Sequence, residues 1–411
     1  MTSLRTKLIK FTIVYTFFSL AMFTSVLSTF ILQATHYYHV SNASAGTLES
    51  YQNITQVLLS FIAFSILLKG GYRNTMLVIL VLMTLTCISM PFLDYYWILK
   101  LYLVFLGFAL VFLKIGVYSS IGLVTNSQEQ HASFVSVVET SWMIASMIGM
   151  WVLSFFLHHI NWLYAFWIFA GFGIVNIALW LLSPLNESAL EKEKNKKISE
   201  QFKEIGQFCK SKYILMFIAM AFIAGLVEQG IFAWLPSFYR DVVDLPGSYS
   251  VQLASAFVLC MALGRIITIA LLKVLRWDRI LFLNYIFGVV FLLFCLGLIQ
   301  QQTHVISSWS EVHIEAFLLP LIGIFIAPTS PLLNSTILSS YDKAQHSLVM
   351  TIITISGALT GSIAARLLGE LFDVLPGITA FKISTIIPLV IVAIAILPYA
   401  KVINKKNAKT H

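Results

Sequence analysis

Long apolar runs alternate with short polar connections along the whole chain. A helix that crosses a lipid bilayer needs about 20 apolar residues. The runs therefore predict membrane-spanning helices, because only helices and closed barrels satisfy their own backbone hydrogen bonds in lipid. Twelve spans are expected, near residues 9–35, 46–68, 75–93, 97–124, 132–157, 162–183, 213–238, 249–272, 280–300, 313–339, 347–372 and 379–400.

The composition agrees with a polytopic all-α membrane protein. The 411 residues are 59% hydrophobic and only 11% charged, whereas soluble domains carry about 25% charged residues. The net charge of +8 does not indicate nucleic acid, because the basic residues fall mainly in short connections and in one central segment. If the amino terminus is inside, most lysines and arginines lie on that side. We therefore expect both termini to be cytoplasmic, in a bacterial inner membrane.

A polar interval divides the predicted spans into two sets of six. The interval "NESALEKEKNKKISEQFKEIGQFCKSK" interleaves Glu and Lys and is typical of a solvated linker. The halves echo each other: "LLKGGYRNTML" resembles "LLKVLRWDRIL", and "QHASFVSVVETS" resembles "QHSLVMTIITIS", at equivalent positions. The predicted organisation is a first half over 1–185, a linker over 186–212, a second half over 213–400 and a tail over 401–411.

Several segments resemble the major facilitator superfamily. "ALGRIITIALLKVLRWDRIL" is similar to its eighth span and following basic loop, and "VEQGIFAWLPSFY" is similar to its seventh span. The nearest likeness is to the fucose-permease-like branch, whose sugar–proton members carry an acidic residue in span four, where this sequence has Lys114. The resemblance implies alternating access of two six-helix halves, with spans 1, 4, 7 and 10 around a central cavity.

Lys114 lies inside the apolar run "LVFLGFALVFLKIGVYSSIGLV", with Tyr118 one turn further on. An ionisable group at membrane depth is expected to face a bundle interior or a wet cavity. Lys114 either attracts an anionic solute, with Tyr118 beside it, or is neutralised by Glu139 on the next span. Glu139 has a second candidate partner in Arg265, since both lie at similar depth. Such a pair would form a gate between the halves, unless Arg265 only caps helix ends or pairs within its own half.

Glu228, deep in the seventh span, is the strongest candidate for proton coupling, because an acid buried at that depth is suited to reversible protonation. Its alternative role is that of a permanently paired structural acid. Gln33, Asn334 and Trp234 complete the expected substrate-binding set with Lys114 and Tyr118, although such polar residues also serve as helix–helix contacts. Pro328 and Pro331 are expected to kink the tenth span near the cavity.

These features favour a secondary active transporter over a membrane enzyme or a sensor. The sequence has no HExxH motif, no GxxxxGK[ST] motif and no added sensor domain. We expect a monomer without cofactor or metal site. It moves a small polar solute, either neutral or anionic, with protons as the coupling ion. The alternatives are efflux of drug-like or siderophore-like compounds and sugar–proton symport.

Overall fold

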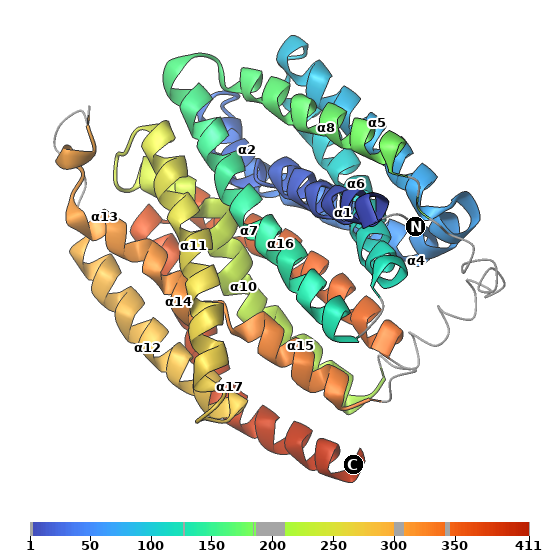
Figure 1. The fold of residues 1–411 in the computed structure, drawn as a ribbon. Coiled ribbons are helices and arrows are strands. Elements are labelled where there is room, and N and C mark those ends of the chain that lie inside the picture. The colour runs from blue at the N-terminus through green and yellow to red at the C-terminus, as the bar shows by residue number, and fades with distance from the viewer. Residues whose placement is uncertain are drawn as a thin grey trace. The chain divides into compact units, whose positions relative to one another are not determined.

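The computed structural model describes residues 3–125, 128–183, 185, 210–299, 308–341 and 346–410. These residues form helices joined by short connections, and no strand occurs among them (Figure 1). Eleven helical segments in the described chain are long and apolar enough to cross a membrane. Helix α4 (Leu48–Gly70), which is 23 residues long, supplies the remaining span of a twelve-helix fold.

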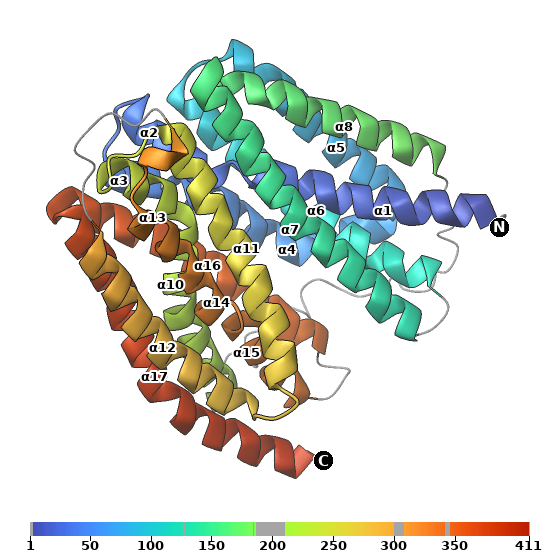
Figure 2. The same cartoon turned by 60° about the vertical axis from the view of Figure 1, so that its left-hand side comes forward.

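The chain divides into two compact units, which Figures 1 and 2 show from two directions. The first comprises Met1–Thr29 and Tyr51–Glu200, and the second comprises Phe30–Ser50 and Gln201–His411. The stretch Phe30–Ser50, which runs from the end of the first predicted span to the start of the second, thus packs with the second unit. The predicted boundaries of the halves stay a prediction, and most of the linker over 186–212 lies outside the described residues.

In the first unit, α1 packs against α6, α7 and α8, and α5 packs against α6 and α8. Arg73, in the first turn of α5, links α5 to α8, because its guanidinium caps the last turn of α8. Its Nε and Nη2 donate to the carbonyls of Trp180 and Leu181 at 2.9 and 3.0 Å. The helices are α1 (Ser3–Thr24), α5 (Tyr72–Ser89), α6 (Tyr96–Val124), α7 (Gln128–His159) and α8 (Ala165–Leu182), with α4.

In the second unit, α10 packs against α11, α16 and α17, and α12 packs against α17 and α14. The last helix continues to Thr410, so it runs through the stretch predicted as a tail. The helices are α2 (Leu27–His36), α3 (Asn42–Gly46), α10 (Lys212–Asp241), α11 (Gly247–Leu271), α12 (Trp277–Leu298), α13 (Ile314–Leu318), α14 (Ile322–Ile326), α15 (Thr329–Ser339), α16 (His346–Val374) and α17 (Gly377–Thr410).

The tenth span is broken where the prolines predict it. Helix α14 ends at Ile326, and α15 begins at Thr329, directly after Pro328. Proline has no N–H to donate and its ring crowds the preceding turn, so a continuous helix is disfavoured there. The break places the first turn of α15, with Thr329 and Ser330, beside the middle of α10, where a cavity opens.

Helix α3 crosses α16 at short range, because Gly46 of α3 and Gly369 of α16 lie at the crossing. A methyl group on Gly369 would lie 2.8 Å from Trp234 Cζ2 and 2.9 Å from the carbonyl carbon of Asn42. The Asp373 carboxylate also accepts hydrogen bonds from the backbone N–H groups of Asn42 and Ala43, at 3.0 and 2.8 Å. These contacts explain why the segment around α3 belongs to the second unit.

Candidate functional site

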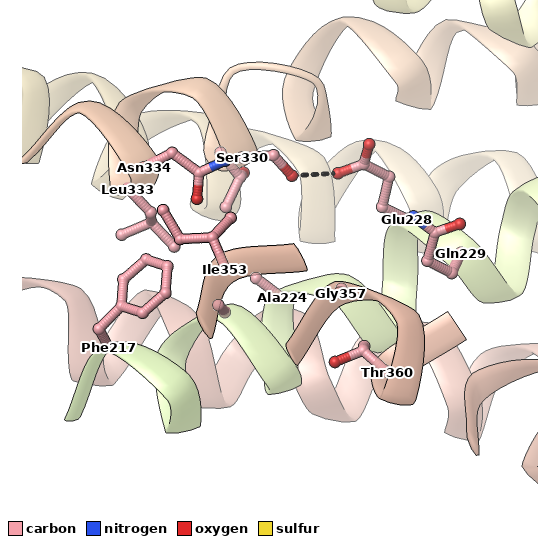
Figure 3. A pocket seen from close by; sticks show the side chains of 13 residues that line it. Phe217, Ala224, Glu228, Gln229, Ser330, Leu333, Asn334, Ile353, Gly357 and Thr360 are labelled. Atoms are coloured by element: carbon pink, nitrogen blue, oxygen red, sulfur yellow. Dashed lines mark hydrogen bonds between the residues drawn. The ribbon is translucent and has the colours of Figure 1, made fainter. Parts of the chain in front are cut away.

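A cavity of about 90 Å³ opens within the second unit, between α10, α15 and α16. It has room for several water molecules. In Figure 3, Glu228 and Gln229 lie at one end and Phe217 at the other, with Ala224 and Gly357 between them. The wall is mixed: the polar side chains come from Glu228, Gln229, Thr329, Ser330, Asn334 and Thr360, and the apolar surface from Phe217, Ala221, Ala224, Leu333 and Ile353.

Glu228 is the acidic residue of this wall. Its Oε2 accepts a hydrogen bond from the hydroxyl of Ser330 at 2.9 Å, drawn as a dashed line in Figure 3. Next to Ser330, Thr329 Oγ1 accepts from the Tyr285 hydroxyl at 2.7 Å, which fixes the first turn of α15 against α12. The proline break therefore brings a donor to the carboxylate on α10.

Arg265 on α11 interacts electrostatically with the Glu228 carboxylate. The guanidinium Nε of Arg265 is buried and has no hydrogen-bond partner within the described chain. The preceding Gly264 explains how α11 comes so close to α14, because a methyl group there would lie 2.8 Å from Ile324 Cα. The Gly-Arg pair seen in the sequence thus combines a close helix crossing with a charge near the cavity.

Two predicted binding residues lie away from the cavity wall. Trp234 is fully buried, its Nε1 donates to the carbonyl of Ala365 at 2.8 Å, and its ring stacks on Phe372 at 5.3 Å. In this structure it is a packing residue between α10 and α16. Gln33 on α2 is also buried, with 8% of its surface exposed, and it does not line this cavity.

The first unit holds the other charged candidates. The Tyr118 hydroxyl donates to Glu139 Oε1, so these two predicted residues do meet. Lys114 is exposed, and its Nζ lies 6.0 Å from the centre of the Trp142 ring. No ion pair within 4 Å joins Lys114 to Glu139, both of which are described. Glu139 and Arg265 belong to different units, and their pairing stays a prediction.

Some residues of these two sites were not found from the sequence. Trp142 lies one turn after Glu139 and packs on Phe17 with ring centres 4.8 Å apart, so helical spacing from Glu139 was the available signal. Thr329 follows Pro328 directly, and the proline break itself pointed to it. Gly357 and Phe217 carry no charge or motif, and nothing in the sequence marked them as cavity residues.

The model of the Major Facilitator Superfamily matches residues 12–365 of the chain. The chain belongs to the major facilitator superfamily. As a member of this superfamily it is a transmembrane transporter rather than an enzyme, which confirms the expected class and fold. A comparison with curated proteins gives no significant match in sequence.

Solved structures of the superfamily have the same fold at low sequence identity. The nucleoside transporter NupG matches with a TM-score of 0.73 and 14% identity, over 95% of this chain and 99% of that chain. The inward-open xylose transporter XylE from E. coli matches with a TM-score of 0.69 and 11% identity, over 96% and 95%. A POT family transporter in complex with 5-aminolevulinic acid matches with a TM-score of 0.69 and 15% identity, over 97% of this chain and 96% of that chain. At such identities the likeness shows the fold alone.

Proposed function

We propose that this superfamily member moves a small polar solute across a bacterial inner membrane by alternating access, with Glu228 as the proton-coupling residue. The observation that carries the proposal is the position of Glu228, which lies on the wall of a polar cavity and is hydrogen-bonded to Ser330. A carboxylate in such a place can bind a proton and contact a solute in the same cycle.

Two groups act on the charge of Glu228. The Ser330 hydroxyl donates a hydrogen bond to its carboxylate, and the positive charge of Arg265 acts on it electrostatically. If a solute or a helix movement separates Glu228 from either group, the stability of its charged form changes, and Glu228 takes up or releases a proton. This gives the transporter a physical link between proton binding and solute binding.

The cavity wall supports an uncharged hydroxylated solute as substrate. Its lining offers amide, hydroxyl and carboxylate groups but no lysine or arginine. The charged group that a carboxylate-bearing solute would meet there is Glu228, which has the same sign and would repel it. Sugar–proton symport is the form of this proposal that agrees with the likeness to the fucose-permease-like branch. Two structural neighbours, a nucleoside transporter and a xylose transporter, are named for solutes of the same hydroxylated class.

A second candidate is transport of an anionic solute, and it rests on Lys114. This lysine is exposed in the first unit and has no carboxylate within 4 Å among the described residues. Its Nζ lies 6.0 Å from the centre of the Trp142 ring, and that ring packs in turn on Phe17. An ammonium group without a fixed partner supports recognition of a carboxylate or phosphate.

The orientation is also part of the proposal. The excess of lysine and arginine in one set of connections supports cytoplasmic termini. We further propose that the transporter functions as a monomer, with protons and the lipid bilayer as its only partners besides the solute.

The test is a solute screen in proteoliposomes with an imposed proton gradient, followed by Glu228→Gln. We expect the variant to lose proton-driven accumulation, because an amide cannot take up the proton, while exchange at equal pH persists. Glu370→Gln is the matched control, since Glu370 is exposed and forms an ion pair with Arg366 one turn away. Undiminished uphill transport by Glu228→Gln would remove this residue from coupling.

A further inference from the structure

Two glycines line the cavity of the second unit, and they do different things. A methyl group on Gly225 of α10 would lie 2.7 Å from Cγ2 of Thr360, so this glycine lets α10 and α16 approach each other. A methyl group on Gly357 of α16 would meet nothing within 4 Å. Gly357 therefore faces open space, and Figure 3 shows it on the cavity wall between Ala224 and Thr360.

A glycine inside a helix has a cost. It is less favourable than alanine there because it loses more backbone freedom on folding. Gly357 lies near the middle of α16 (His346–Val374), and packing does not require it. Its backbone φ is also not in the left-handed region that would demand glycine. A missing side chain at this place leaves room in the cavity.

We propose that Gly357 is the size-determining residue of the cavity. The bare backbone of α16 at Gly357 lines the cavity together with the small side chains of Ala221 and Ala224 of α10. A solute with hydrogen-bonding groups towards Glu228 and Asn334 lays its apolar flank against these small residues. Any side chain at position 357 enters the volume that the flank occupies. The inference rests on the proposed function, because it takes this cavity to be the solute site.

Stability separates this proposal from a packing role. Gly357→Ala is expected to leave the melting temperature of the purified protein unchanged or to raise it, since helix propensity improves and no clash arises. Gly369→Ala is the strained reference, because its new methyl group would press on Trp234 and Asn42. A fall in melting temperature for Gly357→Ala as large as that for Gly369→Ala would overturn the proposal.

Access and transport supply the other readouts. Gly357→Cys is expected to react in the folded protein with 2-aminoethyl methanethiosulfonate, above the labelling of the parent, and an unreactive cysteine would overturn the proposal. In proteoliposomes at equal pH, exchange of glycerol, D-xylose and uridine is compared in the parent, Gly357→Ala and Gly357→Leu. Among the probes that the parent exchanges, we expect the exchange rate of the largest to fall first as the side chain at position 357 grows. In Gly357→Leu the exchange rate of that probe should fall tenfold or more.

The matched control is Gly171→Leu on α8, where a new side chain also meets nothing within 4 Å but the residue does not line the cavity. Equal loss of all probes irrespective of size would indicate a hinge in α16 and would contradict a size filter. Exchange at equal pH needs no net proton movement. A failure of Glu228 as the coupling residue therefore leaves this measurement intact, and the two proposals fail separately.

Discussion

At the scale of single residues, Lys114 and Glu139 differ in the contacts that their charged groups make. Glu139 receives the Tyr118 hydroxyl, and Lys114 lies exposed near Trp142 without a carboxylate within 4 Å among the described residues. The acid is therefore satisfied by a neutral donor, and the lysine is left available. This arrangement favours a ligand role for Lys114 over simple neutralisation of Glu139.

Replacement of Lys114 tests that role. If Lys114 binds an anionic solute, Lys114→Met should weaken binding by about 2 kcal/mol or more, roughly 30-fold, because a partly desolvated charge loses its partner. Lys114→Arg should restore only part of the affinity, since a planar guanidinium does not reproduce a compact ammonium. The measurement is solute affinity by calorimetry, with Lys210→Met as the exposed control. A Lys114→Met/Glu139→Gln double variant that binds like the parent would exclude anion recognition.

At the scale of secondary structure, the crossing of α3 and α16 depends on glycine. Gly46 and Gly369 bring the two backbones together, and a methyl group at Gly46 would lie 2.9 Å from Arg366 Cα. Backbone atoms cannot move aside as a flexible side chain can, so added atoms must push the helices apart. The Asp373 carboxylate adds two charge-assisted hydrogen bonds at the start of α3.

Substitution in this crossing should destabilise the second unit. Gly369→Ala is expected to lower the unfolding free energy by about 1–3 kcal/mol, the usual cost of overpacking. The measurement is the melting temperature in detergent by tryptophan fluorescence. Gly297→Ala is the control, because a methyl group there meets nothing within 4 Å. Equal melting temperatures for both variants would mean that the crossing relaxes without cost.

At the scale of the whole molecule, the proposed gate between Glu139 and Arg265 concerns the transport cycle. If the two residues pair in one access state, Glu139→Arg and Arg265→Glu should each impair transport. The double reversal should recover part of the activity, because the attraction is restored with opposite sign. The measurement is solute exchange in proteoliposomes for the three variants. Arg265 also interacts with Glu228, so additive losses without rescue would assign Arg265 to that carboxylate instead.

The sequence by itself determined the class of the protein and the segments that span the membrane. The apolar run length sets the spans, since unsatisfied backbone groups are excluded from lipid, and all twelve predicted spans correspond to helices in the structure. The break in the tenth span followed from Pro328, whose missing N–H is a local property. Glu228 was found as a rare acid at membrane depth, which also needs no tertiary information.

The tertiary structure alone decided which of these residues line the same cavity. Trp234 looked like a cavity residue from its neighbours in sequence, but its indole is turned to Ala365 and Phe372. Gly357 carried no signal, because the sequence does not tell a glycine that packs from one that faces space; only the neighbours brought by α10 and α15 do. Local chemistry fixes where a helix forms and where it breaks, whereas the direction of each side chain depends on helices that are distant in sequence.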